Sequence, residues 1–304
     1  MALSLKKRIT SDSEYIARTW DYETAVKYIF DINNNILEAG FFTHYKNNRI
    51  IKRVIELPIS YGCPINCKHC ASGEINNISK LYDIDIINMC EYIMNDIGIK
   101  KEDTFLLTYS GIGEGALQRE VIKSASIVLS KKYRNIYFNI STIGIDPLFI
   151  DFCKNLSHLI NIKHLQVTYL HYDTKEITKI VPKAKELGFN FNNLLKKIPK
   201  TGISLSIRFN YILIKNYNDS LSHWNEFIKL ILPYREFIII RISKINQTEI
   251  SLINKINSPD IKVLYDLESF LLSYNFNTHI FTPENIGNNM NCGQLLWNYT
   301  ESKI

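Results

Sequence analysis

The stretch GCPINCKHC, residues 62–70, contains three of the six cysteines of this 304-residue chain. Cys63, Cys67 and Cys70 are separated first by three residues and then by two. A structural zinc site normally has four ligands, supplied as two well-separated pairs. The sequence has no second Cys or His pair at such a spacing, and His69 is adjacent to Cys70, so the two cannot easily bind one small ion. The spacing therefore favours an iron–sulfur cube, in which each thiolate binds a different iron.

Three thiolates leave one iron of a cube without a protein ligand, so that iron can bind a substrate or a cofactor. The C-x3-C-x2-C spacing resembles the signature of radical S-adenosylmethionine (SAM) enzymes. This resemblance implies that Cys63, Cys67 and Cys70 hold a [4Fe-4S] cluster whose open iron binds the amino and carboxylate groups of SAM. It further implies that an electron from the cluster cleaves SAM to a 5′-deoxyadenosyl radical, while the protein binds, orients and shields the cofactors.

The composition is that of a globular protein with a sizeable core, since 46% of the residues are hydrophobic and 22% are charged. A net charge of +6 suits an anionic partner such as RNA, although many proteins without one carry as much charge. The first 15 residues lack the apolar core of a signal peptide, and no apolar run approaches the ~18 residues that a membrane span needs. We therefore expect a cytoplasmic protein with reduced cysteines and no membrane partner.

Strand-like and helix-like segments alternate along most of the chain. Strands are predicted at residues 53–60, 104–109, 136–141, 164–169, 203–214, 236–242 and 277–281, with helical segments between them. Parallel neighbours need such crossover helices, and in α/β barrels the functional residues lie at the carboxyl ends of the strands. The cysteine loop and the segment GIGEG (111–115) each follow a predicted strand. These features predict an α/β fold, a radical SAM partial (β/α)6 barrel over residues 51–282.

Two shorter segments flank the predicted barrel. Residues 1–50 are expected to form an N-terminal helical and strand extension, because residues 13–32 have apolar side chains at helical spacing and residues 36–45 resemble a strand. Residues 283–304 form a C-terminal segment that carries Cys292. Cys90 and Cys153 lie on apolar faces of predicted helices, so we expect both in the core.

The segment YSGIGEG, residues 109–115, follows a predicted buried strand and opens a helix. Its glycines allow close backbone approach and positive φ. By itself this is a common kind of tight turn, but it occurs one strand and one helix after the cysteine triplet. In radical SAM enzymes this strand end holds the amino group of SAM, so the resemblance implies that role for Glu114.

Six stretches in order resemble one family, the radical SAM adenine C-methyltransferases of large-subunit ribosomal RNA, of the RlmN and Cfr type. They are ISYGCPINCKHC (59–70), YSGIGEGALQ (109–118), STIGI (141–145), VTYLHYD (167–173), YILIKNYNDS (211–220) and NCGQL (291–295). The ordered set is far more specific than any single stretch. The resemblance implies a set of SAM-binding residues: Gly113, Glu114, Ser141, Asn246 and the backbone around Leu170 and His171.

The same resemblance implies a covalent role for Cys292, which would accept a methyl group from a first SAM. The radical from a second SAM would then remove a hydrogen atom from that methyl group, and the methylene carbon would attack an sp² carbon of adenine. Ordinary polar methylation by SAM cannot reach this electrophilic amidine carbon, whereas a thioether-stabilised carbon radical can add to it.

The sequence departs from the family pattern at several positions. Glu56 stands seven residues before the first cluster cysteine, where the family has a second cysteine that acts as a base and resolves the protein–RNA crosslink. A carboxylate can take a proton but cannot attack as a thiolate does. Glu56 either faces solvent or points into the barrel. Gly115 replaces a proline, a change expected to affect only the turn, and Arg241 and Lys244 stand where the family has Asn and Pro. The family's N-terminal helical domain is short or absent.

The main hypothesis is a radical SAM methyltransferase that acts on an unactivated sp² carbon of a purine, in RNA or in a nucleotide, through a methylated Cys292. It would need a reductant such as flavodoxin or ferredoxin. The alternative is a radical SAM enzyme without methyl shuttling that acts on a small molecule or peptide, with Glu56 as its acid/base. A third hypothesis is a non-catalytic RNA-binding or regulatory module stabilised by zinc or a cluster.

Overall fold

The computed structural model describes residues 3–17, 20–75, 79–198, 205–284 and 293–301, whose strands form a barrel and a small separate sheet. The barrel strands are β1 (Leu3–Ala17), β2 (Tyr22–Ile32), β3 (Asn35–Lys46), β4 (Arg49–Glu56), β7 (Phe105–Tyr109), β8 (Ile136–Thr142), β9 (Ile162–Tyr169), β10 (Ile207–Leu213), β11 (Ile238–Lys244) and β12 (Asn277–Glu284). They pair in the order β1-β12-β11-β10-β9-β8-β7-β4-β3-β2, and β2 pairs with β1, so the ring is closed. The small sheet contains β5 (Ser60–Tyr61) and β6 (Ser79–Lys80).

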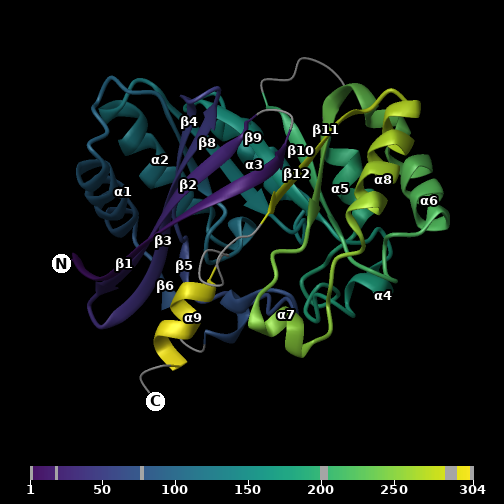
Figure 1. Cartoon of the computed structure of the whole chain (residues 1–304), viewed down its shortest axis with the longest axis horizontal. Coiled ribbons are helices and arrows are strands. Elements are labelled where there is room, and N and C mark those ends of the chain that lie inside the picture. The colour runs from purple at the N-terminus through teal and green to yellow at the C-terminus, as the bar shows by residue number, and fades with distance from the viewer. Residues whose placement is uncertain (1–2, 18–19, 76–78, 199–204, 285–292, 302–304) are drawn as a thin grey trace.

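An arc of parallel strands, from β4 through β7 to β12, makes up most of this ring. The α-helices are α1 (Asp83–Ile97), α2 (Arg119–Lys132), α3 (Leu148–Leu156), α4 (Thr174–Ile177), α5 (Phe191–Lys197), α6 (Leu221–Ile231), α7 (Glu249–Ile253), α8 (Ile261–Ser273) and α9 (Gln294–Glu301). Three short 3₁₀ helices are η1 (Ala71–Glu74), η2 (Gly115–Leu117) and η3 (Leu232–Phe237). Figure 1 shows α1 and α2 on one side of the strands and α5, α6 and α8 on the other. The predicted α/β barrel is confirmed.

The prediction of a helix within residues 13–32 is wrong, because β1 and β2 occupy this region as an antiparallel pair. Every residue from Ala25 to Phe30 is buried, so β2 is covered on both of its faces. A strand that is buried on both faces reads as a nearly continuous apolar run, and its periodicity does not distinguish it from a buried helix. Val26, Tyr28 and Ile29 favour a strand, since β-branched and aromatic side chains fit a pleated sheet.

The first three strands complete the ring that the parallel arc leaves open. β3 pairs with β4, and β1 pairs with β12 antiparallel, with Ala17 opposite Phe281. Figure 1 shows these strands, in purple, crossing the arc from β4 towards β12. The parallel strands predicted from the sequence therefore form an incomplete barrel, and β1, β2 and β3 close it.

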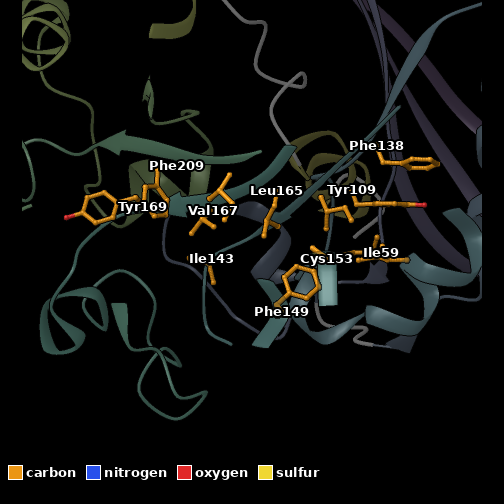
Figure 2. Packing of buried hydrophobic residues seen from close by; sticks show 14 of the residues in the cluster. Ile59, Tyr109, Phe138, Ile143, Phe149, Cys153, Leu165, Val167, Tyr169 and Phe209 are labelled. Atoms are coloured by element: carbon orange, nitrogen blue, oxygen red, sulfur yellow. The ribbon is translucent and has the colours of Figure 1, made fainter. Parts of the chain in front are cut away.

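The core lies between the outer face of the strands and the helices. Figure 2 shows part of this layer, with Phe138, Leu165 and Phe209 from neighbouring strands and Cys153 from α3. Cys153 and Cys90 are both fully buried, which confirms that they are core residues. Among the described residues, no helix combines the length and the apolar character that crossing a membrane would require.

The inner face of the barrel is polar, because side chains along each strand alternate between the core layer and the lumen. On β11, Ile240 and Ile242 are fully buried in the core. Arg241 and Ser243, which alternate with them, both donate hydrogen bonds to the side-chain oxygen of Asn210 on β10. The lumen therefore offers charged and hydrogen-bonding groups to a ligand.

Candidate functional site

The cysteine loop follows β4 and β5 at the carboxyl ends of the parallel strands, as expected. Within the loop, the N–H of Cys63 donates to the carbonyl of Ser72 at 3.1 Å, and the N–H of Cys70 donates to the carbonyl of Cys67 at 3.0 Å. Distant segments also hold the loop backbone. Their hydrogen bonds are Lys68 N–H to Ile180 C=O, Thr248 Oγ1 to His69 C=O, and Asn254 Nδ2 to Lys68 C=O. The loop conformation is thus fixed by protein contacts alone.

The three thiols lie close enough to influence one another electrostatically. Burial raises the pKa of Cys63 to about 12, with a further contribution from Cys70. Burial also raises the pKa of Cys67, with contributions from both other thiols and from Glu114. A desolvated group of thiols beside a carboxylate needs a bound cationic centre in order to ionise. The triplet therefore fits a metal cluster better than it fits free thiols.

A single ion is a poorer match for this arrangement. In the described part of the chain, no group of three or more His, Cys, Asp or Glu side chains is placed to hold a metal ion. An iron–sulfur cube does not require such convergence on one point, because each thiolate binds a different iron. The donor set of Cys63, Cys67 and Cys70 thus fits a cube with one iron left open.

Glu114 lies beside the triplet in the turn between β7 and η2, and only 6% of it is exposed. Its carboxylate accepts hydrogen bonds from the N–H groups of Ala116 and Ile143, both at 3.0 Å, and from the hydroxyl of Thr142. Burial raises the pKa of Glu114, while these donors favour its charged form. A buried carboxylate held in this way can bind an ammonium group of a ligand.

Gly113 and Ser141 complete this part of the site. Gly113 has φ of +116°, and a Cβ there would lie 2.5 Å from the hydroxyl oxygen of Ser60, so only glycine fits. The buried hydroxyl of Ser141 has no hydrogen-bond partner among the described residues. Buried polar atoms are nearly always paired, so an unpaired hydroxyl at a strand end indicates a missing ligand group. The structure brings both residues to Glu114, as the resemblance implies.

Gly115 has a larger role than the sequence indicated. A Cβ at this position would overlap the carbonyl oxygen of Ser141 and would contact the ring of Phe149 at 3.0 Å. The glycine therefore lets the Glu114 turn approach the end of β8. Gly115 therefore sets the distance between the Glu114 turn and Ser141, the two segments predicted to bind SAM, and does not affect the turn alone.

We expect Gly115→Ala to weaken SAM binding several-fold, because the new methyl group must push Ser141 away from Glu114. Titration of the reconstituted protein with SAM measures the change. Gly188→Ala is the matched control, since Gly188 has φ of +83° and no heavy atom within 4 Å of an added Cβ. The control should lose about 1 kcal/mol of stability through backbone strain and keep its SAM affinity. Equal SAM affinity in the two variants would contradict this role of Gly115.

Leu170 and His171 lie at the end of β9, where both are buried. The carbonyl of Leu170 accepts a hydrogen bond from the amide of Asn218 at 2.8 Å, and Nδ1 of His171 accepts one from the N–H of Asp173 at 3.0 Å. Burial lowers the pKa of His171, which favours the neutral ring that this contact requires. Asn246 is exposed between β11 and α7, in the segment whose Thr248 contacts the cysteine loop. No contact of Asn246 with Glu114 or Ser141 is seen among the described residues.

Glu56 points into the barrel, which settles its orientation. One carboxylate oxygen accepts a hydrogen bond from the ammonium of Lys27 at 2.8 Å, and the other accepts one from the hydroxyl of Ser110 at 3.1 Å. The same ammonium lies 3.1 Å from Glu38. The side chains of Lys27 and Glu38 are only 1% and 2% exposed, so this is a buried cation between two carboxylates. Lys27 and Ser110 thus hold the Glu56 carboxylate in place.

Sequence reasoning missed Lys27 and Glu38. Lys27 lies in the apolar run AVKYIF (25–30), and Glu38 lies in ILEAGFF (36–42). A charge inside an apolar strand is a signal of a buried partner, since unpaired buried charges are very costly. The mistaken helix prediction hid this signal, because a helix would have placed Lys27 on a solvated face.

Glu38 connects the barrel to the C-terminal segment. Its two carboxylate oxygens accept hydrogen bonds from the N–H of Gly293 at 3.1 Å and the N–H of Leu296 at 2.9 Å, at the start of α9. A carboxylate is favourable there, because the first N–H groups of a helix lack internal partners. Gly293 has φ of +76°, and a Cβ there would lie 2.6 Å from the hydroxyl oxygen of Ser72. The helix α9 contacts η1, which follows the cysteine loop, and the N–H of Glu249 at the start of α7 donates a hydrogen bond to the side chain of Gln294; Figure 1 shows α9 and α7 at the same end of the barrel.

Cys292 itself lies outside the described residues, so its role stays a prediction. Its neighbour in sequence, Gly293, packs against Ser72, which lies two residues after the last cysteine of the triplet. Gly293, the residue that follows Cys292 in the sequence, therefore lies next to the cluster loop.

Comparison with known proteins adds to this geometry. No protein-family model matches the chain. A probable dual-specificity RNA methyltransferase RlmN from Dictyoglomus turgidum is 30% identical over 215 residues, which are 67% of this chain and 58% of that protein. The corresponding protein from Dictyoglomus thermophilum is 26% identical over 294 residues, 91% of this chain and 77% of that one. The chain thus spans less than two thirds of the first relative and about three quarters of the second.

A solved structure shares the fold. A radical SAM methyltransferase from Sphaerobacter thermophilus superposes with a TM-score of 0.78 over 96% of this chain and 80% of that one, at 16% sequence identity. At 16% identity this superposition shows only that the two proteins share the barrel architecture. The similarity in amino-acid sequence is to the two relatives named RlmN.

Proposed function

Because this chain belongs, as a divergent member, to the RlmN-type family of radical SAM methyltransferases, we propose that it methylates an sp² carbon of a purine, in RNA or in a nucleotide. Cys292 would carry the transferred carbon. We assign the enzyme to the cytoplasm, with a reductant such as flavodoxin or ferredoxin. The single observation that carries the proposal is the convergence of three segments at one end of the barrel: the cysteine triplet, the Glu114 turn and the start of α9.

Each of these segments would have a distinct task. Bound at the open corner of a [4Fe-4S] cluster, SAM supplies a 5′-deoxyadenosyl radical. Cys63, Cys67 and Cys70 would hold the cluster, and Glu114 would orient the amino group of SAM. The unpaired hydroxyl of Ser141 would donate to a polar group of the same cofactor. Burial of the site keeps water from reactive species.

The resolving step differs from that of the family. After the triplet and Cys292, the remaining cysteines of the chain are Cys90 and Cys153, which are fully buried in α1 and α3. Neither is available to act as a thiolate at the barrel mouth. Glu56 occupies the position of the family's second cysteine and is paired with Lys27. We infer that this enzyme releases its product without a second thiol of its own.

This departure keeps a second candidate function open. Without a resolving thiol, the chain could cleave SAM and act on a small molecule or peptide with no methyl group on Cys292. The contact of Glu56 with the hydroxyl of Ser110 favours this candidate, because it places the carboxylate beside the turn that leads to Glu114.

The variant Cys292→Ala separates these candidates. We expect it to form 5′-deoxyadenosine at a rate close to that of the wild type, because contacts with Ser72, Ile180, Thr248 and Asn254 hold the cluster loop, and to lose methyl transfer completely. Mass spectrometry of the peptide containing Cys292, after exposure to SAM labelled in its methyl group, tests the first step directly. Methyl transfer that persists in the variant, or a wild-type Cys292 that stays unmethylated, would favour the second candidate.

A further inference from the structure

Positively charged side chains gather in the barrel lumen towards the amino ends of the strands, away from the cysteine loop. Lys52 lies on β4, and Arg208 and Arg241 lie on β10 and β11. Two histidines accompany them, His164 on β9 and His279 on β12, and His279 is the register partner of Arg241. Four of these five residues lie on the neighbouring strands β9 to β12, and closure of the barrel brings Lys52 on β4 to them.

The rings of Trp20 and Phe281 lie between the cations of Lys52 and Arg241. The ammonium of Lys52 lies 5.6 Å from the centre of the Trp20 ring, and the guanidinium of Arg241 lies 4.4 Å from that of Phe281. The rings of Trp20 and Phe281 are 5.4 Å apart in an edge-to-face arrangement. Lys52 and Arg241 therefore flank a single aromatic cluster, which provides a cation–π contact to each.

Two of these cations donate hydrogen bonds to neutral side chains. Arg208 donates to the side-chain oxygen of Gln166 at 3.1 Å, and Arg241 donates to that of Asn210 at 2.8 Å. The Nε of Arg208 is buried and has no hydrogen-bond partner among the described residues. Within the same part of the chain, no carboxylate lies within ion-pair distance of Lys52.

The carboxylate of Glu23 interacts electrostatically with Lys52. It lies 3.3 Å from His44, which is the register partner of Lys52, and its charge raises the pKa of Lys52 slightly. The larger effects are opposite: burial, Arg208, Arg241 and Lys163 together lower the pKa of Lys52 to about 7. The pKa of His279 is lowered to about 4 by burial, Arg241, Arg208 and Lys52. Among the described residues, Glu23 thus faces a group of cations that repel one another: Lys52, Lys163, Arg208 and Arg241.

A buried group of like charges is unfavourable unless a counter-charge is bound, because desolvation and mutual repulsion act together. We propose that Lys52, Arg208 and Arg241 form a binding site for a phosphate group inside the barrel. Guanidinium groups donate several hydrogen bonds in a fixed geometry that matches the oxygens of phosphate. The unpaired Nε of Arg208 is a donor ready for such an oxygen.

This phosphate site and the candidate SAM site share one wall of the lumen. Gln166, which accepts the hydrogen bond from Arg208, pairs in register with Ser141 of β8. A ligand with its phosphate at Arg208 would extend along this wall towards Ser141. The phosphate could belong to a mononucleotide, to an RNA backbone or to the free ion. The inference does not depend on methyl transfer.

Calorimetric titration of the reconstituted protein with inorganic phosphate, at constant ionic strength, tests the site. We expect one phosphate per chain and at least about tenfold weaker binding in Arg208→Gln and in Lys52→Gln, equivalent to 1.4 kcal/mol or more. Lys123→Gln, which changes an exposed cation on α2, is the matched control and should bind as the wild type does. Equal phosphate affinity in all four proteins, or no binding to any of them, would overturn the proposal.

Thermal unfolding separates a ligand site from a purely structural role. Without phosphate, Lys52→Gln should unfold at the same temperature as the wild type or higher, because it removes a repelling charge; with phosphate, only the wild type and the control should gain stability. A lower unfolding temperature in Lys52→Gln, with the phosphate effect intact, would reject the site.

Adenosine, 5′-AMP and a short RNA oligonucleotide distinguish the sources of the phosphate. Tighter binding of AMP than of adenosine, lost in Arg208→Gln, supports a mononucleotide. Tighter binding of the oligonucleotide than of AMP, with the same loss, supports an RNA backbone. If phosphate alone shows the loss, the free ion is the ligand. If none of these ligands shows the loss, the lumen holds no phosphate site.

Discussion

Cys67→Ser protein, reconstituted anaerobically with iron and sulfide, is expected to bind no SAM-competent cluster and to form no detectable 5′-deoxyadenosine. In the proposed site each of the three thiolates would hold a separate iron, so the loss of one would leave a cube with two protein ligands. Serine keeps the size of the side chain but is a much weaker ligand for iron than a thiolate is.

Iron and sulfide analysis, the visible absorption spectrum and a 5′-deoxyadenosine assay measure this outcome. Cys153→Ser is the matched control, because Cys153 is buried in α3 and away from the loop. The control should keep its cluster and its SAM cleavage while losing some stability. Full iron content and wild-type SAM cleavage in Cys67→Ser would show that the triplet is not the cluster site.

Lys27→Met is expected to destabilise the protein by about 3–5 kcal/mol, the cost of removing one partner from a buried ion pair. The ammonium of Lys27 is hydrogen-bonded to both Glu38 and Glu56, so its removal leaves one buried and one partly buried carboxylate without this cation. Urea unfolding measures the loss. The triple variant Lys27→Met, Glu38→Gln, Glu56→Gln should recover much of it, since it removes all three charges. A triple variant no more stable than Lys27→Met would contradict this explanation.

The ion-pair network of Lys27, Glu38 and Glu56 also contacts the segment that follows Cys292. Glu38 also accepts the N–H groups of Gly293 and Leu296, so Glu38→Gln should loosen the start of α9. We expect less methylation of Cys292 in this variant and nearly unchanged formation of 5′-deoxyadenosine, because the cluster loop and Glu114 keep their own hydrogen bonds. A proportional loss of both activities would indicate a general disturbance of the fold.

Much of the fold and of the candidate site could be predicted from patterns within short segments of the sequence. The cysteine spacing, the turn at Glu114 and the alternation of strands and helices are each written in short segments, so they could be read without a structure. The helix predicted within residues 13–32 failed because burial on both faces removes the alternation that marks a strand. That one error concealed both Lys27 and the strands that close the barrel.

The chemical groups that the chain can offer are evident from the order of its residues: three thiolates within eight residues, and a carboxylate in a glycine turn one strand later. Which distant groups meet is evident only in the folded chain, where Lys27 contacts Glu56, Glu38 contacts Gly293, and two aromatic rings connect Lys52 with Arg241. The physical reason is that these contacts depend on strand register and ring closure, which arise from hydrogen bonds between strands far apart in the chain. A charge within an apolar run, such as Lys27, indicates that a buried partner exists, but the neighbouring residues do not identify that partner.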